Sequence, residues 1–398
     1  MKILFVHDGP MMSNPSKTVF YGVHYTNEIV DRYSYFGDSV TFLMRNIVIS
    51  EADGGQFTPL THPAFNFIEV PNFKSIRSIL RQKEAKSIIE KAVSEHDVII
   101  ARLPSANGVI AKKSAEKLGK PVLVEVVACV FDALWNYDWR GKLLAHYKMF
   151  QYKRHIRSAS HVIYVTEKFL QERYPTQGKS VGCSDVVLQY LNKEILEKRL
   201  RKISNFSGKI VLGTVAAIDV PYKGHADVIK ALSRLKKIGN TNFLYKIVGQ
   251  GNPERLNALI EKLNLIEQVE ILGSLPHKKI FDFFDSLDSY IQPSSVEGMP
   301  RSVIEAMSMG CPVLATELGG HPELITKEAL YKPGDIIKLT ELLSDFSNLP
   351  LKKWATENFN RSLDFKSDIL SQKRMQFYSA FKTFADSNLI APTQKDET

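Results

Sequence analysis

Two carboxylates stand eight positions apart in a stretch rich in small residues, QPSSVEGMPRSVIEAMSMG, over residues 292–310. The stretch follows an apolar strand and predicts a loop through Glu297 and Gly298, then a helix that begins at Pro300. The backbone N–H groups of residues 299–302 would be unpaired at the start of this helix. Together with the helix dipole they favour an anion such as a phosphate, and Gly298 has no side chain to hold such a ligand away.

The second carboxylate, Glu305, would lean toward the same anion because helical side chains tilt toward the N-terminus. A carboxylate beside a phosphate is repelled, so Glu305 is better suited to the vicinal hydroxyls of a ribose. Glu297 is suited to a sugar ring on the other side of the phosphates, and Ser302 adds a hydroxyl. The alternative is that Glu305 pairs with Arg301 on a solvated helix face and that Glu297 is an ordinary loop residue.

A lysine in the stretch DVPYKGHADVIKAL points to the same chemistry. Lys223 comes just before a predicted helix, where a cation opposes the helix dipole at a cost of about 0.3–1 kcal/mol. A bound diphosphate would reverse that sign by taking the lysine, Gly224 and the helix start together. The alternative is a loop lysine in solvent.

These residues need a scaffold, and the chain predicts two α/β halves with a boundary near residues 199–208. Strands that are apolar on both faces alternate with amphipathic helices, which is typical of parallel sheets covered on both sides. The carboxyl ends of such strands are where ligands bind. The predicted strands are 2–8, 38–45, 96–103, 120–130 and 161–166 in the first half, and 208–218, 243–249, 269–273, 289–294 and 311–316 in the second.

Composition excludes several classes of protein. The 398 residues fit two domains, and three scattered cysteines without a CxxC pair argue against disulfides and zinc. The N-terminus lacks a signal-peptide core and no apolar run could span a bilayer, so we expect a cytoplasmic protein. Neither a DxD carboxylate pair nor a histidine ligand spacing is present, so we expect no metal and no cofactor.

The motifs together resemble one family. The segment EGMPRSVIEAM is similar to the E-x7-E motif of the retaining GT-B glycosyltransferases of family four. The segments YKGHADVIKAL, IVGQGNPERLNALIEKLNL, ILGSLP and GCPVLATELGGHPELI match the C-terminal domain of that family in order and spacing. The resemblance is close over residues 208–330 and general in the N-terminal half.

The resemblance implies a GT-B fold, in which two Rossmann-like doubly wound parallel-sheet domains face a central cleft. Residues 1–200 would bind the acceptor and residues 205–368 a nucleotide sugar, with the C-terminal helix 370–390 packing back on the first domain. Glu297 and Lys223 would be catalytic, contacting the transferred sugar and the leaving diphosphate, and Glu305 would hold the ribose. Further donor-binding residues would be Gly298, Met299, Pro300, Arg301, Ser302, Val303, Gly249 and Gly251.

Two positions depart from the family pattern. The family commonly has an arginine five positions before the lysine, where this chain has Ile218. One phosphate cation is therefore missing or comes from elsewhere, for which Arg301 is a candidate. A histidine that often follows the strand PVLVEV is replaced by Val127 and Ala128. The residues on the acceptor side are thus candidates only: Gly9, Arg102, Glu125 and Asp132.

The N-terminal half also carries most of the positive charge, with 27 Lys and Arg against 20 Asp and Glu in residues 1–200. Residues 139–157, WRGKLLAHYKMFQYKRHIR, predict a basic aromatic helix with an apolar side of Leu143, Leu144, Tyr147, Phe150 and Ile156. Such a helix fits an anionic membrane at its inner face, or else packs on its own sheet with solvated lysines. No nucleic-acid motif is present.

The function predicted from the family resemblance is therefore transfer of a sugar from a nucleotide diphosphate, such as a UDP-sugar, with retention of configuration. The acceptor would be a glycan or a polyprenyl-diphosphate-linked glycan in surface polysaccharide synthesis. The alternatives are a non-catalytic nucleotide-sugar-binding or partner module, or a sugar-nucleotide epimerase of the same fold. The identity of the base, the sugar and the acceptor, and the oligomeric state, do not follow from the sequence.

Overall fold

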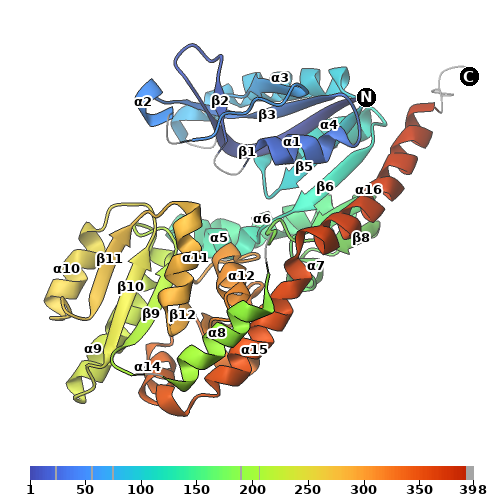
Figure 1. Ribbon diagram of the computed structural model, residues 1–398. Coiled ribbons are helices and arrows are strands. Elements are labelled where there is room, and N and C mark those ends of the chain that lie inside the picture. The colour runs from blue at the N-terminus through green and yellow to red at the C-terminus, as the bar shows by residue number, and fades with distance from the viewer. Residues whose placement is uncertain (23–24, 55–56, 74–75, 189–190, 206, 391–398) are drawn as a thin grey trace, which may run out of the picture.

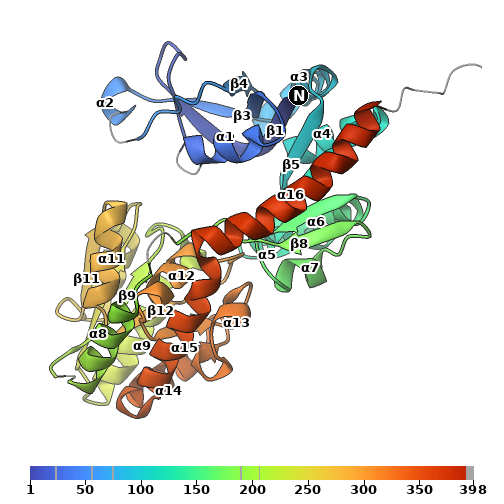
Figure 2. The same ribbon diagram turned by 45° about the vertical axis from the view of Figure 1, so that its right-hand side comes forward.

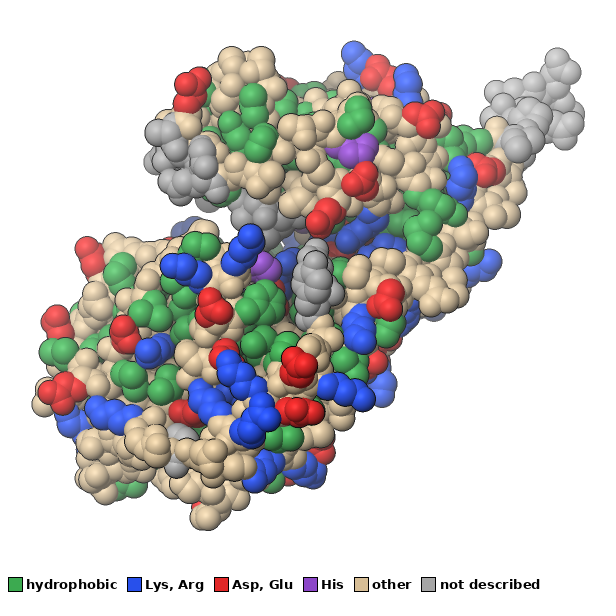
Figure 3. All heavy atoms as spheres, in the orientation of Figure 1, with side chains coloured by type: hydrophobic (Ala, Val, Ile, Leu, Met, Phe, Trp, Pro, Cys, Tyr) green, Lys and Arg blue, Asp and Glu red, His purple; other side chains and the backbone are tan. Residues whose placement is uncertain are grey.

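The computed structural model describes residues 1–22, 25–54, 57–73, 76–188, 191–205 and 207–390. They form two lobes, one above the other in Figure 1, and each lobe is built on a largely parallel sheet. This is the doubly wound α/β architecture predicted from the alternating pattern. A groove separates the lobes on the face shown in Figure 3. No helix within the described ranges is long and apolar enough to cross a membrane.

The N-terminal lobe has the strand order β4-β3-β1-β5-β6-β7-β8, with β2 paired antiparallel to β1. Its strands are β1 (Lys2–Ser13), β2 (Phe20–Tyr21), β3 (Ser39–Val48), β4 (Phe65–Glu69), β5 (Val98–Leu103), β6 (Val122–Val126), β7 (His161–Tyr164) and β8 (Lys179–Gly182). Its helices are α1 (Asn27–Ser34), α2 (Glu51–Gly54), η1 (Ile76–Arg81), α3 (Gln82–Glu95), α4 (Ala106–Lys117), α5 (Val130–Trp135), α6 (Trp139–Arg157) and α7 (Phe169–Arg173).

The C-terminal lobe has the order β11-β10-β9-β12-β13-β14, so β9 lies between β10 and β12. Its strands are β9 (Ile210–Val215), β10 (Phe243–Val248), β11 (Val269–Gly273), β12 (Ser289–Gln292), β13 (Val313–Thr316) and β14 (Leu330–Tyr331). Its helices are α9 (His225–Lys237), α10 (Glu254–Lys262), α11 (His277–Ser286), α12 (Arg301–Ser308), α13 (His321–Leu324), α14 (Ile336–Ser344) and α15 (Leu351–Ser362), with 3-10 turns η2 (Pro221–Lys223), η3 (Lys327–Ala329), η4 (Phe346–Asn348) and η5 (Leu363–Phe365). In such an order the loops after β9 and its neighbours meet at a crevice.

The central strands are buried on both faces. In β1 the side chains of Ile3 and Phe5 join one apolar cluster, and those of Leu4 and Val6 join the cluster on the other face. Alternate side chains of a strand point to opposite faces, so a continuous apolar run is what a strand between two helix layers requires.

Several predicted strand ends are wrong. The strand predicted at 120–130 ends at Val126, the one at 208–218 ends at Val215, and the one at 38–45 continues to Val48. The first strand differs most. It was predicted to span residues 2–8, but β1 continues through Gly9 and Pro10 to Ser13. A register shift between Val6 and Pro10 absorbs the irregular pair, after which β1 pairs with Arg45–Val48 of β3. Since β3 extends equally far, the ladder offers backbone partners that the local sequence does not show.

The chain crosses between the lobes twice, and the two crossings lie side by side. The Leu188 N–H donates to the Phe365 carbonyl at 2.9 Å, and the Ser367 N–H donates to the Leu188 carbonyl at 3.1 Å. After the first crossing, α8 (Lys193–Ser204) leads into the second lobe. After the second, α16 (Ser367–Ile390) returns along the N-terminal lobe (Figure 2), where Phe36 contacts the rings of Tyr378 and Phe381.

Candidate active site between the lobes

An ion pair joins the two predicted catalytic residues. Lys223 ends η2, at the carboxyl end of β9, and Glu297 lies in the loop after β12. Lys223 Nζ is 2.7 Å from Glu297 Oε1, and both side chains are largely buried. The turn depends on Gly224, whose φ is +77° and where a Cβ would lie 2.0 Å from the Pro293 carbonyl oxygen. Only glycine fits there, which fixes the lysine over the β12 loop.

The Glu297 carboxylate is held in its ionised form. Burial alone would raise its pKa, but the charge of Lys223 and further hydrogen bonds outweigh burial and leave the pKa below the ordinary value. Gln292 Nε2 donates to the same Oε1 at 3.0 Å. A negative charge is therefore fixed at the centre of the site, with its cation in contact.

Helix α12 begins beside this pair without a side-chain cap. Its N-cap is Pro300, which makes no side-chain hydrogen bond to the helix start. The Ser302 hydroxyl is already engaged, since it accepts from the Tyr290 hydroxyl at 2.8 Å and donates to Gln292 Oε1 at 3.4 Å. A ligand at this helix end would therefore meet backbone N–H groups rather than the Ser302 hydroxyl. Val303 would offer such a ligand only its amide, because its side chain is buried in the core.

Glu305 is buried, which contradicts the alternative of a solvated helix face. Its Oε1 lies 3.2 Å from Nε2 of His277, not against Arg301 as that alternative required. Burial raises the pKa of Glu305, and the hydrogen bond from His277 opposes the shift only in part. Glu305, with its ionised form disfavoured by burial, and the exposed imidazole of His277 could together form hydrogen bonds with the polar groups of a ligand. His277 could not be predicted from the sequence, apart from its place directly after the ILGSLP segment.

The two lobes approach each other closely at Gly298. A Cβ at this position would lie 2.7 Å from the Val127 carbonyl oxygen of the N-terminal lobe. The next residue, Met299, packs against the apolar clusters of both lobes. Val127, which stands where the family often has a histidine, thus presents its backbone to the Glu297 loop.

The predicted glycine loop packs against the segment that follows β9. Gly249 follows β10 and its N–H donates to the Gly273 carbonyl at 2.9 Å. A Cβ at Gly251, whose φ is +123°, would lie 2.4 Å from Asp219 Oδ1. Ile218, at the position of the missing arginine, is buried, and Arg255 Nη2 donates to its carbonyl at 3.4 Å. Arg255 is thus a cation near this loop that sequence reasoning missed.

His321 is a further buried neighbour of the pair. Its Nδ1 is 2.7 Å from the Thr316 carbonyl oxygen, so Nδ1 carries the proton, and its Nε2 is buried without a hydrogen-bond partner among the described residues. Burial lowers its pKa, although the Glu297 charge acts in the other direction. The imidazole is therefore neutral at pH 7.

The acceptor-side candidates fall into two groups. Arg102 donates to Glu125 Oε2 at 2.9 Å and to Asp185 Oδ2 at 2.6 Å, so Arg102 and Glu125 are tied into a buried network. Gly9, now within β1, donates its N–H to His7 Nδ1 at 2.9 Å. Its position above the cleft is therefore set by hydrogen bonding within the N-terminal lobe.

Asp132 lies apart from that network, at a cavity between the lobes. Its Oδ1 pairs with Arg173 Nη2 at 2.9 Å. The cavity holds about 430 Å³, and Asn136 on its rim donates to the Ser295 carbonyl at 3.2 Å across the lobes. Its other lining residues are Phe169, Glu317, Leu318, Gly319, Pro322 and Pro333. Gly319 packs against the Glu297 carbonyl, where a Cβ would lie 2.3 Å away, so the cavity adjoins the Glu297 loop.

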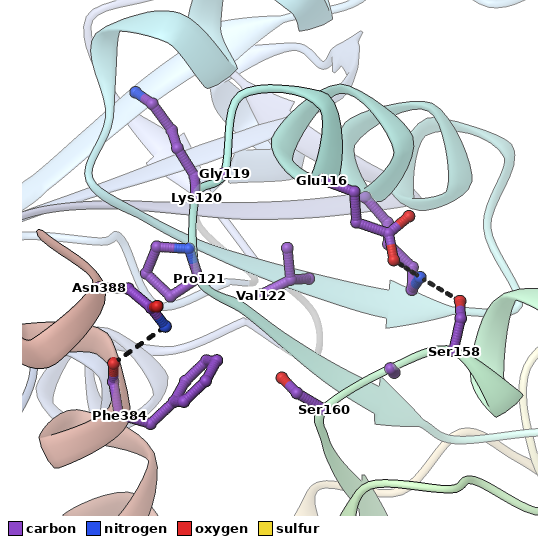
Figure 4. A pocket seen from close by; sticks show the side chains of 11 residues that line it. Glu116, Gly119, Lys120, Pro121, Val122, Ser158, Ser160, Phe384 and Asn388 are labelled. Carbon is purple, nitrogen blue, oxygen red and sulfur yellow. Dashed lines mark hydrogen bonds and ion pairs between the residues drawn. The ribbon is translucent and has the colours of Figure 1, made fainter. Parts of the chain in front are cut away.

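A second cavity, of about 260 Å³, lies away from the candidate site (Figure 4). It is at the amino ends of β6 and β7, the opposite edge of the sheet from the cleft. Its buried cation, Lys112, is bonded to Glu116 and to Ser158 Oγ. Its second cation, Lys120, donates to the backbone carbonyls of residues 93, 94 and 96, so both ammonium groups are already engaged within the lobe.

Comparison with known proteins identifies relatives of the whole chain. Residues 197–361 match the family described as glycosyl transferases group 1. The chain is 32% identical over 363 residues to Protein CapJ of Staphylococcus aureus, covering 90% of this chain and 89% of that one. It is also 32% identical over 167 residues to the putative colanic acid biosynthesis glycosyltransferase WcaL of Escherichia coli K12, covering 38% of this chain and 40% of WcaL. Anabaena HepE in complex with UDP superposes with a TM-score of 0.63 at 18% identity, covering 96% of this chain and all of HepE.

Proposed function

Because this chain belongs to the glycosyl transferases group 1 family, it is a glycosyltransferase, and we propose that it transfers a sugar from a UDP-type nucleotide sugar with retention of anomeric configuration. The proposed acceptor is a glycan carried on a polyprenyl diphosphate, used in surface polysaccharide synthesis at the cytoplasmic face of a membrane. The E. coli relative is named for colanic acid biosynthesis, which supports a role in surface polysaccharide synthesis. HepE was solved with UDP, which supports a UDP-type donor.

The observation that carries the proposal is the Lys223–Glu297 contact at the uncapped start of α12. Breaking a sugar–phosphate bond leaves positive charge on the sugar carbon and added negative charge on the diphosphate. Fixed charges and N–H dipoles aimed at these positions stabilise the transition state. Lys223 and the N–H groups at the start of α12 would bind the diphosphate, while the ionised Glu297 would face the sugar.

These residues also support transfer without a metal ion. The ammonium of Lys223 and the positive end of α12 supply the charge that a divalent cation would otherwise bring to the diphosphate. On the ribose side, Glu305 and His277 together offer hydrogen-bonding groups for vicinal hydroxyls. Arg255 and Arg301 are the further cations that we place near the donor.

We place the acceptor in the cavity between the lobes, beside Asp132 and behind the Glu297 loop. Asp132 lies next to Arg173 there, so the acceptor hydroxyl would meet both an acceptor and a donor of hydrogen bonds. Gly9, Arg102 and Glu125 would act by shaping the N-terminal wall of the cleft rather than by contact with the reacting atoms.

A thermal-shift panel of UDP-, GDP- and ADP-sugars tests the donor assignment. A ligand at a hundred times its dissociation constant stabilises a protein by about 2.7 kcal/mol, and we expect this from a UDP-sugar. Replacement Glu305→Gln should weaken the response, and turnover of the donor in the presence of an extracted lipid fraction tests the acceptor. A panel without any stabilising nucleotide sugar would refute the proposal.

A further inference from the structure

An apolar stripe runs along the exposed side of α6. Trp139, Leu143, Tyr147 and Phe150 are three or four residues apart, so they lie on one face of the helix. Their exposed fractions are 67%, 73%, 57% and 67%. We call these four residues the α6 stripe. Ile156, predicted on the same side, is instead buried on the inward face.

The stripe is not the packing face of the helix. The inward face is made by Gly141, Ala145 and Ile156, which are all buried. A Cβ at Gly141 would lie 2.2 Å from the Leu134 carbonyl oxygen, so α6 packs closely on α5 through its small residues. The α6 stripe is therefore not part of the core of the N-terminal lobe and stays exposed on its surface.

Large apolar side chains are also exposed just before α6, at the end of α5 and in the turn after it. Trp135 and Tyr137, which precede α6, are exposed by 41% and 77%. A contiguous group of large apolar side chains at the surface marks an interaction site, whereas single exposed residues do not. Ile238 and Ile266 are equally exposed but lie in the C-terminal lobe, away from α6.

The charges around the stripe select the kind of partner. Residues 139–157 contain six Lys and Arg and no acidic residue. Arg140 lies 5.4 Å from the centre of the Trp139 ring, and Lys142 lies 5.8 Å from that of Trp135. A helix with aromatic and leucine side chains on one face and basic residues beside them lies in the boundary between acyl chains and anionic headgroups, where Trp and Tyr are enriched.

We propose that the α6 stripe docks this protein on an anionic lipid bilayer. The stripe adjoins the cleft, because α5 lines the cavity between the lobes and its neighbour Asn136 donates to Ser295 across them. Docking by this surface would bring the opening of the cavity to the level of the headgroups. The docking itself does not depend on the proposed activity, since it needs neither donor nor acceptor.

Vesicle flotation with the full chain tests the proposal. We expect binding to phosphatidylcholine vesicles that contain phosphatidylglycerol, weakened by added salt, and little binding to pure phosphatidylcholine. The variant L143S/F150S should lower partitioning by about tenfold or more, because each substitution removes an apolar side chain from the bilayer. The matched control I238S/I266S should bind as the parent does, and circular dichroism should confirm that both variants are folded.

Three results would overturn the proposal. The first is no binding to either vesicle. The second is equal binding by L143S/F150S and the parent. The third is a dimer, seen by light scattering of the parent, that L143S/F150S abolishes, because a second copy of the chain would then cover the stripe.

Discussion

Removing Lys223 should destabilise the empty protein as well as impair donor binding. The side chains of Lys223 and Glu297 are exposed by only 22% and 11%. In Lys223→Met the Glu297 carboxylate stays buried, with Gln292 as a remaining hydrogen-bond donor. Breaking a buried ion pair from one side costs about 3–5 kcal/mol. Because Lys223 is partly exposed and Gln292 remains, we expect about 2–3 kcal/mol.

The double variant Lys223→Met, Glu297→Gln should regain most of that stability. It removes both charges, so no carboxylate is left without a cation, and its free energy of unfolding should lie within about 1 kcal/mol of the parent's. Urea unfolding can be followed by the fluorescence of Trp354, which is buried in the C-terminal lobe. Neither variant should be stabilised by a UDP-sugar as the parent is, because both lack the Lys223 ammonium group that would bind the diphosphate.

The same pair predicts a dependence on pH. In the parent the pKa of Glu297 is below its ordinary value, so this group stabilises the fold above its unfolded pKa and loses that contribution as the pH falls through the folded pKa. Without Lys223, burial dominates and the pKa rises, so the deficit of Lys223→Met should shrink as the solution becomes acidic. The reasoning would be refuted if Lys223→Met had the same free energy of unfolding as the parent at pH 7, or if UDP-sugars stabilised this variant as much as they stabilise the parent.

Three further substitutions test other parts of the site. Burial raises the pKa of Glu305, so the parent loses stability as the pH rises through that pKa. Glu305→Gln should therefore be more stable than the parent at pH 8 but should bind the donor about tenfold more weakly by calorimetry. A variant that is less stable than the parent at pH 8 would contradict this prediction. Gly298→Ala places a methyl group 2.7 Å from the Val127 oxygen, so kcat/KM should fall by about ten- to a hundredfold while the urea midpoint holds, and parental activity would mean that the lobes need not approach here. Glu323→Gln removes the carboxylate charge that accepts hydrogen bonds from the backbone N–H groups of residues 167–169 at 2.7, 3.1 and 2.6 Å. Hydrogen exchange of these three amides should therefore become about fivefold faster. Unchanged exchange would show that this contact does not hold the two lobes together.

The parallel sheets could be predicted from the sequence because their strands are apolar on both faces, a pattern that half-exposed strands do not show. Glu305 illustrates the limit of such reasoning. Spacing within one helix predicted Arg301 as its partner in the alternative without a ligand. Its partner in the structure is His277, 28 residues away on another helix. A contact between helices that are distant in the chain leaves no periodic signal. The Lys223–Glu297 contact has the same character, since the two residues were linked only through an expected ligand.

Helix periodicity also decides less at the ends of a helix than at its centre. Ile156 was grouped with Leu143 and Phe150 because the stretch is basic and aromatic throughout. The structure turns Ile156 inward, and its neighbours Ala159 and Val162 are buried in the same cluster. The exposed stripe therefore ends at Phe150, and only the packing against α5 and the sheet reveals where it stops.

The paired crossings between the lobes mean that the first lobe is not one continuous piece of chain. Phe36 is buried beneath Tyr378 and Phe381, which arrive only with the last helix, after the whole second lobe has been made. A fragment ending near residue 200 would be synthesised with this apolar surface bare. The shortest separately expressible version of that lobe would have to join residue 188 directly to residue 366, a splice that the hydrogen bonds at Leu188 already bring within reach.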